Sequence, residues 1–315
     1  MANTDYGTDG LLATTLKKYI PTLADNVFSS KPLLWILKQG GRVVNVDGGE
    51  KIVQPLMYAE APNVGSYQGS DVFATDANTG ISVAEYPARQ FYGLFSITGI
   101  ERAKNSGKQA LLKLLTTRAK QLEMSMSERM EAMLYGDGSG NAGKDFFGLG
   151  AIIEASNPSW GNLGGIDRDT YAYWQAQEVD ENGSLVIASM ATTYNNCSEG
   201  VDQPSNIITT QDAYEQYEVL LEDQVRYADT KMGDAGFQNL LYKGAPITFS
   251  PNVTTGEMLF LNIKYIELNS LAGVWFKPSD LLQPTNQDAF YKHLLCYGNL
   301  TVSNCKRQGK LYGIT

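Results

Sequence analysis

The segment from Gly138 to Lys144 has the residue spacing of a phosphate-binding loop. It matches GxxxxGK, and its three glycines also match GxGxxG. Both motifs bind phosphate through backbone N–H groups at the start of a helix that follows a strand. Here a long helical pattern comes before the glycines, and Asp145 stands where a Ser or Thr would hold magnesium. We therefore predict a flexible connection from a helix to a short buried strand or turn at 146–153.

Other side chains suited to catalysis or metal binding are few and scattered. The single histidine, His293, lies in a strand-like and partly apolar stretch, where a structural or exposed role is the usual one. One histidine cannot form a cluster of histidine ligands, and the three cysteines include no CxxC pair. No GxSxG elbow occurs. We therefore expect no catalytic residues, no metal and no cofactor, so that the protein is not an enzyme.

Composition narrows the class of protein further. The chain has 315 residues, of which 43% are hydrophobic, so it has material for a sizeable core. Its net charge of −9 makes it a poor general binder of nucleic acid. A basic cluster of Lys306, Arg307 and Lys310 is interpreted as a solvated face. The three thiols are expected to stay reduced, in a protein that folds in a cytoplasm.

The N-terminal region is interpreted as an arm covering residues 1–40. Acidic Asp5 and Asp9 stand where a secretory signal would carry basic residues, and the apolar run at 33–37 is too short to span a bilayer. We therefore expect neither export by that route nor a place in a membrane. The run contains Leu34 and Trp35, which we expect to dock on the arm's own body or on a neighbour.

Residues 41–104 are interpreted as a long two-stranded ribbon. Strand-forming residues flank a polar, glycine-bearing stretch between Gly65 and Gly80, which predicts a wide tip. A two-stranded ribbon is marginal in water on its own. An extended ribbon therefore indicates that a partner completes it.

The clearest local pattern predicts one long helix over residues 108–135. Apolar residues recur with helical spacing at Leu111, Leu115, Ala119, Leu122, Met126, Met130 and Met133. Residues 105–107 offer an N-cap, and Gly136 begins a glycine-rich stop. At 1.5 Å per residue the helix would be about 42 Å long. A helix of this length is typical of a strut that crosses a whole subunit.

The second half of the chain predicts alternating helices and strands. We expect a helix near 184–197, a short strand at 206–208, and a second helix capped by Thr209 or Thr210. A strand follows at 257–262, and the final stretch 288–315 is strand-like. With the long helix, this pattern predicts an α+β fold.

The order of these parts resembles the major capsid proteins of tailed bacteriophages, which have the Hong Kong 97-type fold. That family has an N-terminal arm, an extended hairpin called the E-loop, a long spine helix, a peripheral (P) domain and an axial (A) domain. Three segments resemble phrases common in the family, and they lie at 164–174, 204–210 and 236–262. The resemblance covers nearly the whole chain.

The resemblance implies a division of the chain into five parts. They are the arm at 1–40, the E-loop with its flanking strands at 41–104, the P domain at 105–175 with the spine helix at 108–135, the A domain at 176–284, and the return strands of the P domain with the C-terminal end at 285–315. Contacts between subunits would then involve Leu34, Trp35, Tyr58, Tyr67, Phe73 and Arg89.

The function implied is self-assembly. Copies would form hexamers and pentamers that close into an icosahedral head around double-stranded DNA, without sequence-specific binding. The implied partners are other copies of the chain, a portal protein, a separate scaffolding protein and a decoration protein. The protein would be located in the virion, after assembly in the host cytoplasm. Some family members cross-link through an E-loop lysine, but no lysine lies between Lys51 and Lys104. We therefore expect no such cross-link.

Three alternatives remain open. A shell protein of an encapsulin-type compartment would have the same fold, and a neighbouring cargo enzyme would favour it. A nucleotide-binding enzyme would use residues 138–144, and stabilisation by nucleotide would favour it. A tail or adhesion protein fits less well, because a strut helix and an α/β second half do not suit a fibre.

Overall fold

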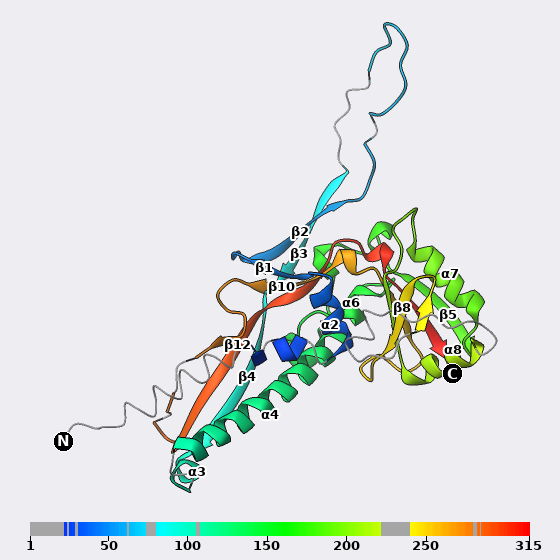
Figure 1. Cartoon of the computed structure of the whole chain (residues 1–315). Coiled ribbons are helices and arrows are strands. Elements are labelled where there is room, and N and C mark those ends of the chain that lie inside the picture. Colours follow the sequence, from blue (N-terminus) through cyan, green and yellow to red (C-terminus); the bar gives the residue numbers. More distant parts are fainter. Residues whose placement is uncertain are drawn as a thin grey trace.

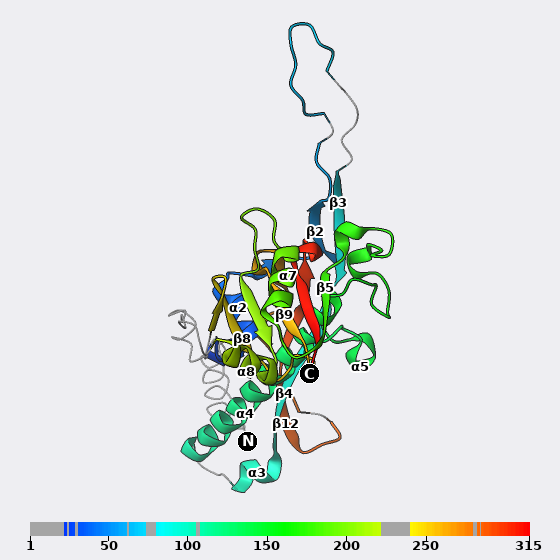
Figure 2. The ribbon, with the colours of Figure 1, turned by 90° about the vertical axis from the view of Figure 1, so that its right-hand side faces the viewer.

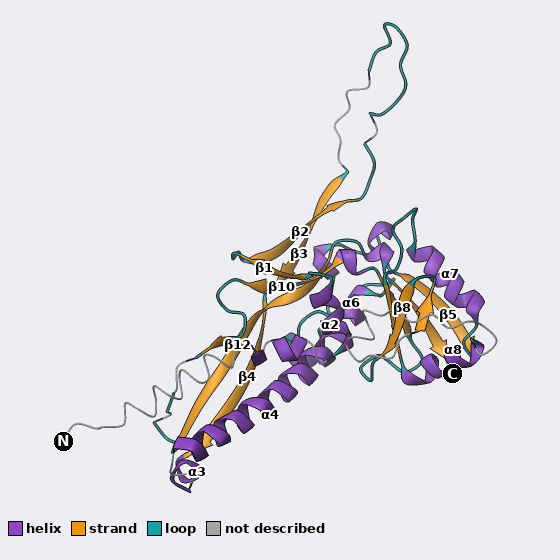
Figure 3. Cartoon of the chain, in the orientation of Figure 1, coloured by secondary structure: helices purple, strands orange, loops and turns teal. Residues whose placement is uncertain are grey.

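The structure is a computed structural model of the whole chain (Figure 1). It describes residues 22–23, 25–28, 31–61, 63–73, 80–104, 108–221, 240–279, 282–283 and 285–315. Two sheets and one long helix make up the body, and a two-stranded ribbon extends away from it (Figure 3). The mixture of helices and sheets agrees with the predicted α+β class. Within the described part of the chain, none of the helices combines the length and the apolar character needed to cross a bilayer.

The long helix has the predicted bounds. α4 runs from Lys108 to Tyr135, and it ends where the glycine-rich stretch begins. The apolar stripe is buried at Ala119, Leu122, Met126, Met130 and Met133, while the side chains of Leu111 and Leu115 lie outside the described residues. The predicted N-cap at 105–107 also lies outside them. Burial of the stripe against a sheet explains why so long a helix is stable.

The first sheet collects strands from distant parts of the chain. Its members are β1 (Val43–Val46), β4 (Arg89–Thr98), β10 (Ile266–Leu271), β11 (Lys277–Pro278) and β12 (Ala289–Val302). β12 is the central strand, and it pairs antiparallel with β4, β10 and β11. The helix α4 lies along β4, and α3 (Gly99–Lys104) joins the two at their far end (Figure 2).

The second sheet forms a separate α/β layer. Its strands, in spatial order, are β5 (Gln177–Gly183), β13 (Gly309–Ile314), β9 (Met258–Leu261), β6 (Asn206–Thr209), β8 (Ala245–Phe249) and β7 (Leu240–Tyr242). Helices α7 (Ile187–Cys197) and α8 (Gln211–Leu220) pack their buried tyrosines into its core. The hydroxyl of Thr210 accepts a hydrogen bond from the N–H of Ala213 at 3.4 Å, which confirms the predicted cap.

The ribbon is shorter than predicted. β2 (Lys51–Met57) and β3 (Ile81–Pro87) pair antiparallel over their full length. On either side of them the chain joins the first sheet instead, because β1 pairs with β10 and β4 pairs with β12. In β4 every second residue is buried, so this strand needs a core that a free ribbon cannot provide. The expectation that residues 41–104 form one ribbon is therefore wrong at both ends.

The described part of the arm is folded onto the subunit. Helix α2 (Pro32–Gln39) buries Leu33, Leu34 and Leu37 completely. Leu23 and Val27 before it are also buried. The leucines of the apolar run at 33–37 are therefore buried within the subunit itself, which was one of the two predicted outcomes. Residues 1–21 lie outside the described residues.

Short elements connect α4 to the second sheet. They are α5 (Gly140–Gly143), α6 (Leu149–Ile152), η1 (Leu163–Gly165) and η2 (Ala172–Trp174), while η3 (Ile263–Tyr265) and η4 (Cys305–Arg307) lie later in the chain. Residues 146–153 were predicted to form a short buried strand or a turn, and the strand is wrong, because the four-residue helix α6 occupies the centre of the segment. The fully buried guanidinium of Arg168 holds this region together, since it donates to the carbonyls of Ala151, Ile152 and Trp174 at 2.8, 2.9 and 3.1 Å.

Candidate functional site

The glycine-rich loop at 138–144 does not form a phosphate cradle. It follows a helix, and its own carbonyls occupy its N–H groups: Gly143 donates to Ser139 at 2.9 Å and Lys144 donates to Gly140 at 3.2 Å. A phosphate-binding loop needs such N–H groups to be free and convergent. The loop therefore acts as a turn between two helices.

Arg89 fixes this loop from the side. Its guanidinium donates to the carbonyls of Gly138, at 2.6 Å, and Asp145, and it lies 4.1 Å above the ring of Phe147. Burial lowers the pKa of Arg89, while the nearby carboxylates of Asp145 and Asp137 oppose that change. Two hydrogen bonds that Arg89 donates go to the loop of its own subunit, and its contact with a neighbouring subunit stays a prediction.

The histidine and the cysteines do not converge on a site. His293 is half-buried on β12, and its ring stacks on Tyr291 with centroids 6.5 Å apart. The three cysteines are free and buried, and burial raises the pKa of Cys197 and Cys296 to about 12. Among the described residues, no cluster of three or more His, Cys, Asp or Glu side chains is placed to hold a metal.

The basic cluster near the C-terminus is mostly internal. Lys310 is only 9% exposed, and its ammonium donates to Glu154 at 2.8 Å and lies 3.4 Å from Glu178. Arg307 is 8% exposed and forms an ion pair with Glu199. The interpretation of this cluster as a solvated face is therefore wrong for both residues. Lys310 instead ties β13 to the segment that follows α6.

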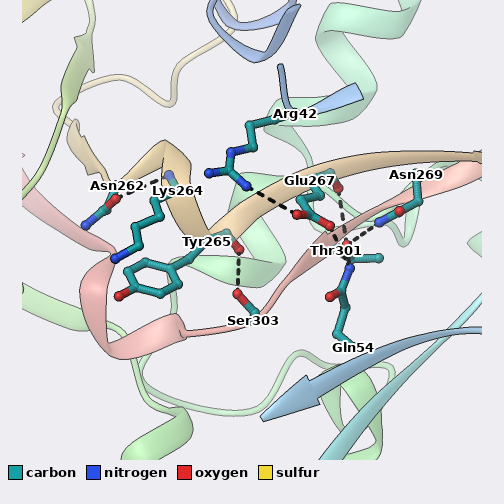
Figure 4. Close-up of polar contacts among 9 residues, drawn as sticks. All are labelled: Arg42, Gln54, Asn262, Lys264, Tyr265, Glu267, Asn269, Thr301 and Ser303. Carbon is teal, nitrogen blue, oxygen red and sulfur yellow. Dashed lines mark hydrogen bonds and ion pairs between the residues drawn. The ribbon is translucent and has the colours of Figure 1, made fainter. Parts of the chain in front are cut away.

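The base of the ribbon is anchored to the first sheet by polar contacts (Figure 4). The amide of Gln54 donates to Glu267 at 3.0 Å and to Thr301 at 3.1 Å. Arg42 donates to the same carboxylate of Glu267 at 3.3 Å. Through these contacts, the side chain of Gln54 ties the base of the ribbon to β10 and β12. The base therefore has a fixed orientation on the first sheet.

Two aromatic contacts complete the anchor. The ring of Tyr58 stacks on Tyr173 with centroids 4.9 Å apart. The hydroxyl of the fully buried Tyr86 donates to the carbonyl of Val302 at 2.8 Å. The ribbon therefore leaves the body in a defined direction, with Tyr58 at the point of departure.

Beyond Tyr58 the ribbon exposes large apolar side chains. Tyr67 and Phe73 meet edge to face with centroids 5.1 Å apart, yet they remain 65% and 64% exposed. Val64 and Val72 are 83% and 97% exposed. Apolar side chains gathered on one protruding segment are uncommon on a monomeric protein and are typical of an interaction surface.

The remaining residues predicted for contacts between subunits have different surroundings. Leu34 is 0% exposed, so its side chain has no surface to offer a neighbour and that assignment is wrong. Trp35 is partly buried against the subunit core, and Tyr58 is 40% exposed beside Tyr173. Tyr67 and Phe73 thus carry the most exposed aromatic surface of the predicted set.

Glu131 is a buried carboxylate that no sequence motif singles out. Glu131 on α4 has no exposed surface, and its carboxylate accepts the backbone N–H groups of Leu33 and Leu34 at 3.0 and 3.2 Å. It thereby caps the N-terminus of α2. Glu131 is not part of the predicted apolar stripe, and no local signal identifies a capping partner so distant in the chain.

Comparisons with known proteins identify the fold. No family model matches the sequence, and no curated protein matches it. The structure is similar to the capsid of cyanophage A-1(L), with a TM-score of 0.65 and 16% identity over 87% of this chain and 90% of that one. It is also similar to the SrpI encapsulin of Synechococcus elongatus, with a TM-score of 0.57 and 11% identity over 89% of this chain and 87% of that one.

A third similar structure comes from the procapsid of satellite phage P4. Its TM-score is 0.54 at 13% identity, over 94% of this chain and 90% of that one. These identities are low, but each match covers nearly the whole of both chains. The chain therefore has the fold of phage capsid proteins and encapsulins, as the order of its elements predicts.

Proposed function

We propose that this chain is the major capsid protein of a tailed bacteriophage. Its copies form hexamers and pentamers that close into an icosahedral head around double-stranded DNA. The main support is the ribbon, which carries Tyr67, Phe73, Val64 and Val72 out of the body with most of their surface exposed. Such a surface is satisfied when copies of the chain pack against one another.

The fold supports the same proposal. In this description the ribbon is the E-loop, α4 is the spine helix, the first sheet belongs to the P domain and the second sheet to the A domain. A shell repeats each contact many times, so interfaces that are individually weak combine to a stable assembly. The net charge of −9 suits a shell wall that encloses DNA without binding it sequence-specifically.

Assembly of the purified protein tests the proposal. Negative-stain electron microscopy, with and without a scaffolding protein from the same genome, is expected to show round shells of uniform size. A variant with Tyr67→Ser and Phe73→Ser should fold but fail to form shells. A matched control, Val201→Ser, replaces a side chain that is 98% exposed on the second sheet's layer and should assemble normally. A chain that stays monomeric under every condition would contradict the proposal.

An encapsulin-type compartment is the second candidate, because one similar structure is an encapsulin. The content of the particles decides between the two. Heads purified from infected cells should contain DNA, a portal protein and, where present, a decoration protein, in virions assembled in the host cytoplasm. Particles that hold a cargo enzyme and no DNA would favour the compartment.

Covalent cross-links give a further distinction within the family. No lysine occurs between Lys51 and Lys104, so the E-loop has no amine for an isopeptide bond. Particles boiled in detergent should therefore release single chains on a denaturing gel. A ladder of cross-linked species would contradict this part of the proposal.

A further inference from the structure

Residues 102–120 form a strongly basic segment in a chain whose net charge is −9. The segment covers most of α3 and the first half of α4, and its sequence contains no Asp or Glu. Its cations are Arg102, Lys104, Lys108, Lys113, Arg118 and Lys120. A helix face that only meets water ordinarily carries charges of both signs. A run of one sign therefore indicates a partner of the opposite sign.

The stability of α4 does not explain where these charges are placed. The N-terminus of a helix carries partial positive charge, so carboxylates stabilise its first turn and cations destabilise it. The first turn of α4 nevertheless holds Lys108 and no acidic residue. The acidic residues of this helix come only in its second half, at Glu123, Glu128 and Glu131. The cations of the first half therefore reduce the stability of the helix, and a function outside the helix accounts for them.

Positions 113 and 120 lie on one face of α4, because seven residues make two turns of a helix. The apolar stripe occupies a different face, on which Ala119 and Leu122 are buried. Lys120 is exposed, and so is Thr117, which stands between the two positions along the helix. At 1.5 Å per residue the two positions are about 10 Å apart. This face of α4 is therefore open to a partner.

The exposed side chains around Lys120 suit phosphate better than a protein partner. They are Thr116, Thr117 and Gln121, all of which are polar and uncharged. Lys, Thr and Gln side chains commonly contact the phosphate oxygens of nucleic acids. The core of a protein–protein interface is enriched in aromatic side chains instead. The tip of the ribbon, with Tyr67 and Phe73, has that aromatic character, and residues 116–121 do not.

The basic segment lies at one end of the molecule. Figures 1 and 2 show that α3 and the start of α4 together form the end opposite the tip of the ribbon. Lys104 at the end of α3 is exposed there. Arg118 is already engaged within the subunit, since its guanidinium donates to Glu101 at 2.8 Å. The lysines of this end therefore supply most of the charge that a ligand can reach.

We infer that the basic segment contacts the phosphate backbone of the enclosed DNA, so that α3 and the first half of α4 face the lumen of the shell. The inference rests on the proposed function, which supplies the DNA. Each copy makes a few contacts that carry no sequence information and that weaken steeply with salt. Because a shell repeats these contacts in every copy, they combine to hold the outermost DNA against the wall.

Binding of a short DNA duplex to the unassembled full-length protein tests the contact. Fluorescence anisotropy gives the binding constant for duplexes of two unrelated sequences, between about 50 and 200 mM salt. Lys113→Gln with Lys120→Gln should weaken binding to both duplexes equally. It should also reduce the slope of log binding constant against log salt by about 2, since each lost phosphate contact removes about 0.9. The matched control, Lys144→Gln with Lys306→Gln, removes two other exposed cations and should keep the wild-type slope.

Photo-crosslinking in DNA-filled heads tests which way the segment faces. The three native cysteines are buried, so a benzophenone maleimide labels an introduced thiol selectively. A benzophenone at Thr117→Cys should form an adduct with the DNA when the heads are irradiated. The control Val201→Cys carries the label at a side chain that is 98% exposed on the second sheet's layer, and it should form none.

The outcomes separate this inference from the proposed function. Equal salt slopes in the two double variants, with shells that form normally, would overturn the DNA contact and leave the shell intact. An adduct at Val201→Cys and none at Thr117→Cys would also overturn it. If the Lys113 and Lys120 variant binds DNA like the wild type but no longer assembles, the segment binds an acidic protein surface and the inference is wrong. Particles that never contain DNA would instead contradict the proposed function.

Discussion

Glu131 accepts a hydrogen bond from the backbone N–H of Leu33 at 3.0 Å, across a separation of 98 residues. The second carboxylate oxygen accepts the N–H of Leu34, so one side chain of α4 caps the whole start of α2. A carboxylate at a helix N-terminus is favourable, but this one is removed from water. Burial raises the pKa of Glu131 to about 7, although both hydrogen bonds and the charge of Lys31 oppose the rise.

This relationship predicts a pH-dependent stability. A carboxyl group with a raised pKa in the folded state holds its proton more tightly there than in the unfolded chain. Its stabilising effect is therefore complete below the ordinary value of 4.5 and is lost as the pH rises toward 7. The shift corresponds to a loss on the order of 3 kcal/mol. The free energy of unfolding in urea, measured between pH 4.5 and 8, should fall accordingly.

Two variants test whether Glu131 causes this fall in the free energy of unfolding with pH. Glu131→Gln removes the titrating group, so the decline between pH 4.5 and 8 should largely disappear. Glu128→Gln changes an exposed carboxylate on the same helix and should leave the slope unchanged. An equal slope in the Glu131→Gln protein would show that the pH dependence has another source.

Arg168 should be essential to the stability of the segment between α4 and the second sheet. Arg168→Met would leave the carbonyls of Ala151, Ile152 and Trp174 without their donor. Each buried group left unpaired costs about 1–3 kcal/mol, so a total loss of at least about 3 kcal/mol is expected. Urea unfolding checks it. Arg129→Met, at a side chain that is 56% exposed, should cost about 1 kcal/mol or less, and similar losses in both variants would contradict the assignment.

Gly93 permits the close approach of β4 and α4. A Cβ atom at this position would lie 2.4 Å from the Sδ of Met126 and 2.8 Å from Leu122, both of which are buried. Gly93→Ala should therefore lower the free energy of unfolding by about 1–3 kcal/mol. Gly183→Ala, where nothing lies within 4 Å, is the control and should have little effect. Thermal unfolding compares the two variants. Equal unfolding midpoints would contradict the close packing of Gly93 against α4.

The stack of Tyr58 on Tyr173 should hold the base of the ribbon. Tyr58→Ala removes one ring, and aromatic pairs contribute about 0.5–1.5 kcal/mol beyond their buried area. Proteases should then cleave residues 58–73 several-fold faster in the unassembled protein. Tyr58→Phe keeps the ring and should match the wild type. If Tyr58→Ala shows no faster cleavage, Gln54 and Tyr86 are sufficient to hold the ribbon.

The sequence alone determined those features whose signal is local. The helix at 108–135 was predicted at its observed bounds because seven apolar residues repeat with helical spacing, and only a helix buries such a stripe. The cap at Thr210 followed from residue type and position. The resemblance to the capsid family singled out Tyr67 and Phe73 for contacts between subunits, and both side chains are exposed in the structure.

The tertiary structure alone decided which distant segments meet. Leu34 and Arg89 were predicted to contact a neighbouring subunit. Within the subunit, the backbone N–H of Leu34 donates to Glu131 and the side chain of Arg89 donates to the loop at 138–144. The ribbon is shortened because β1 and β4 find partners more than 180 residues away, in β10 and β12. Lys310 is buried for the same reason, since its carboxylate partners come from other strands and loops. The burial of a side chain and the pairing of a strand depend on which distant segments lie opposite them in the fold. The periodicity of residues along the chain contains no information about those distant partners.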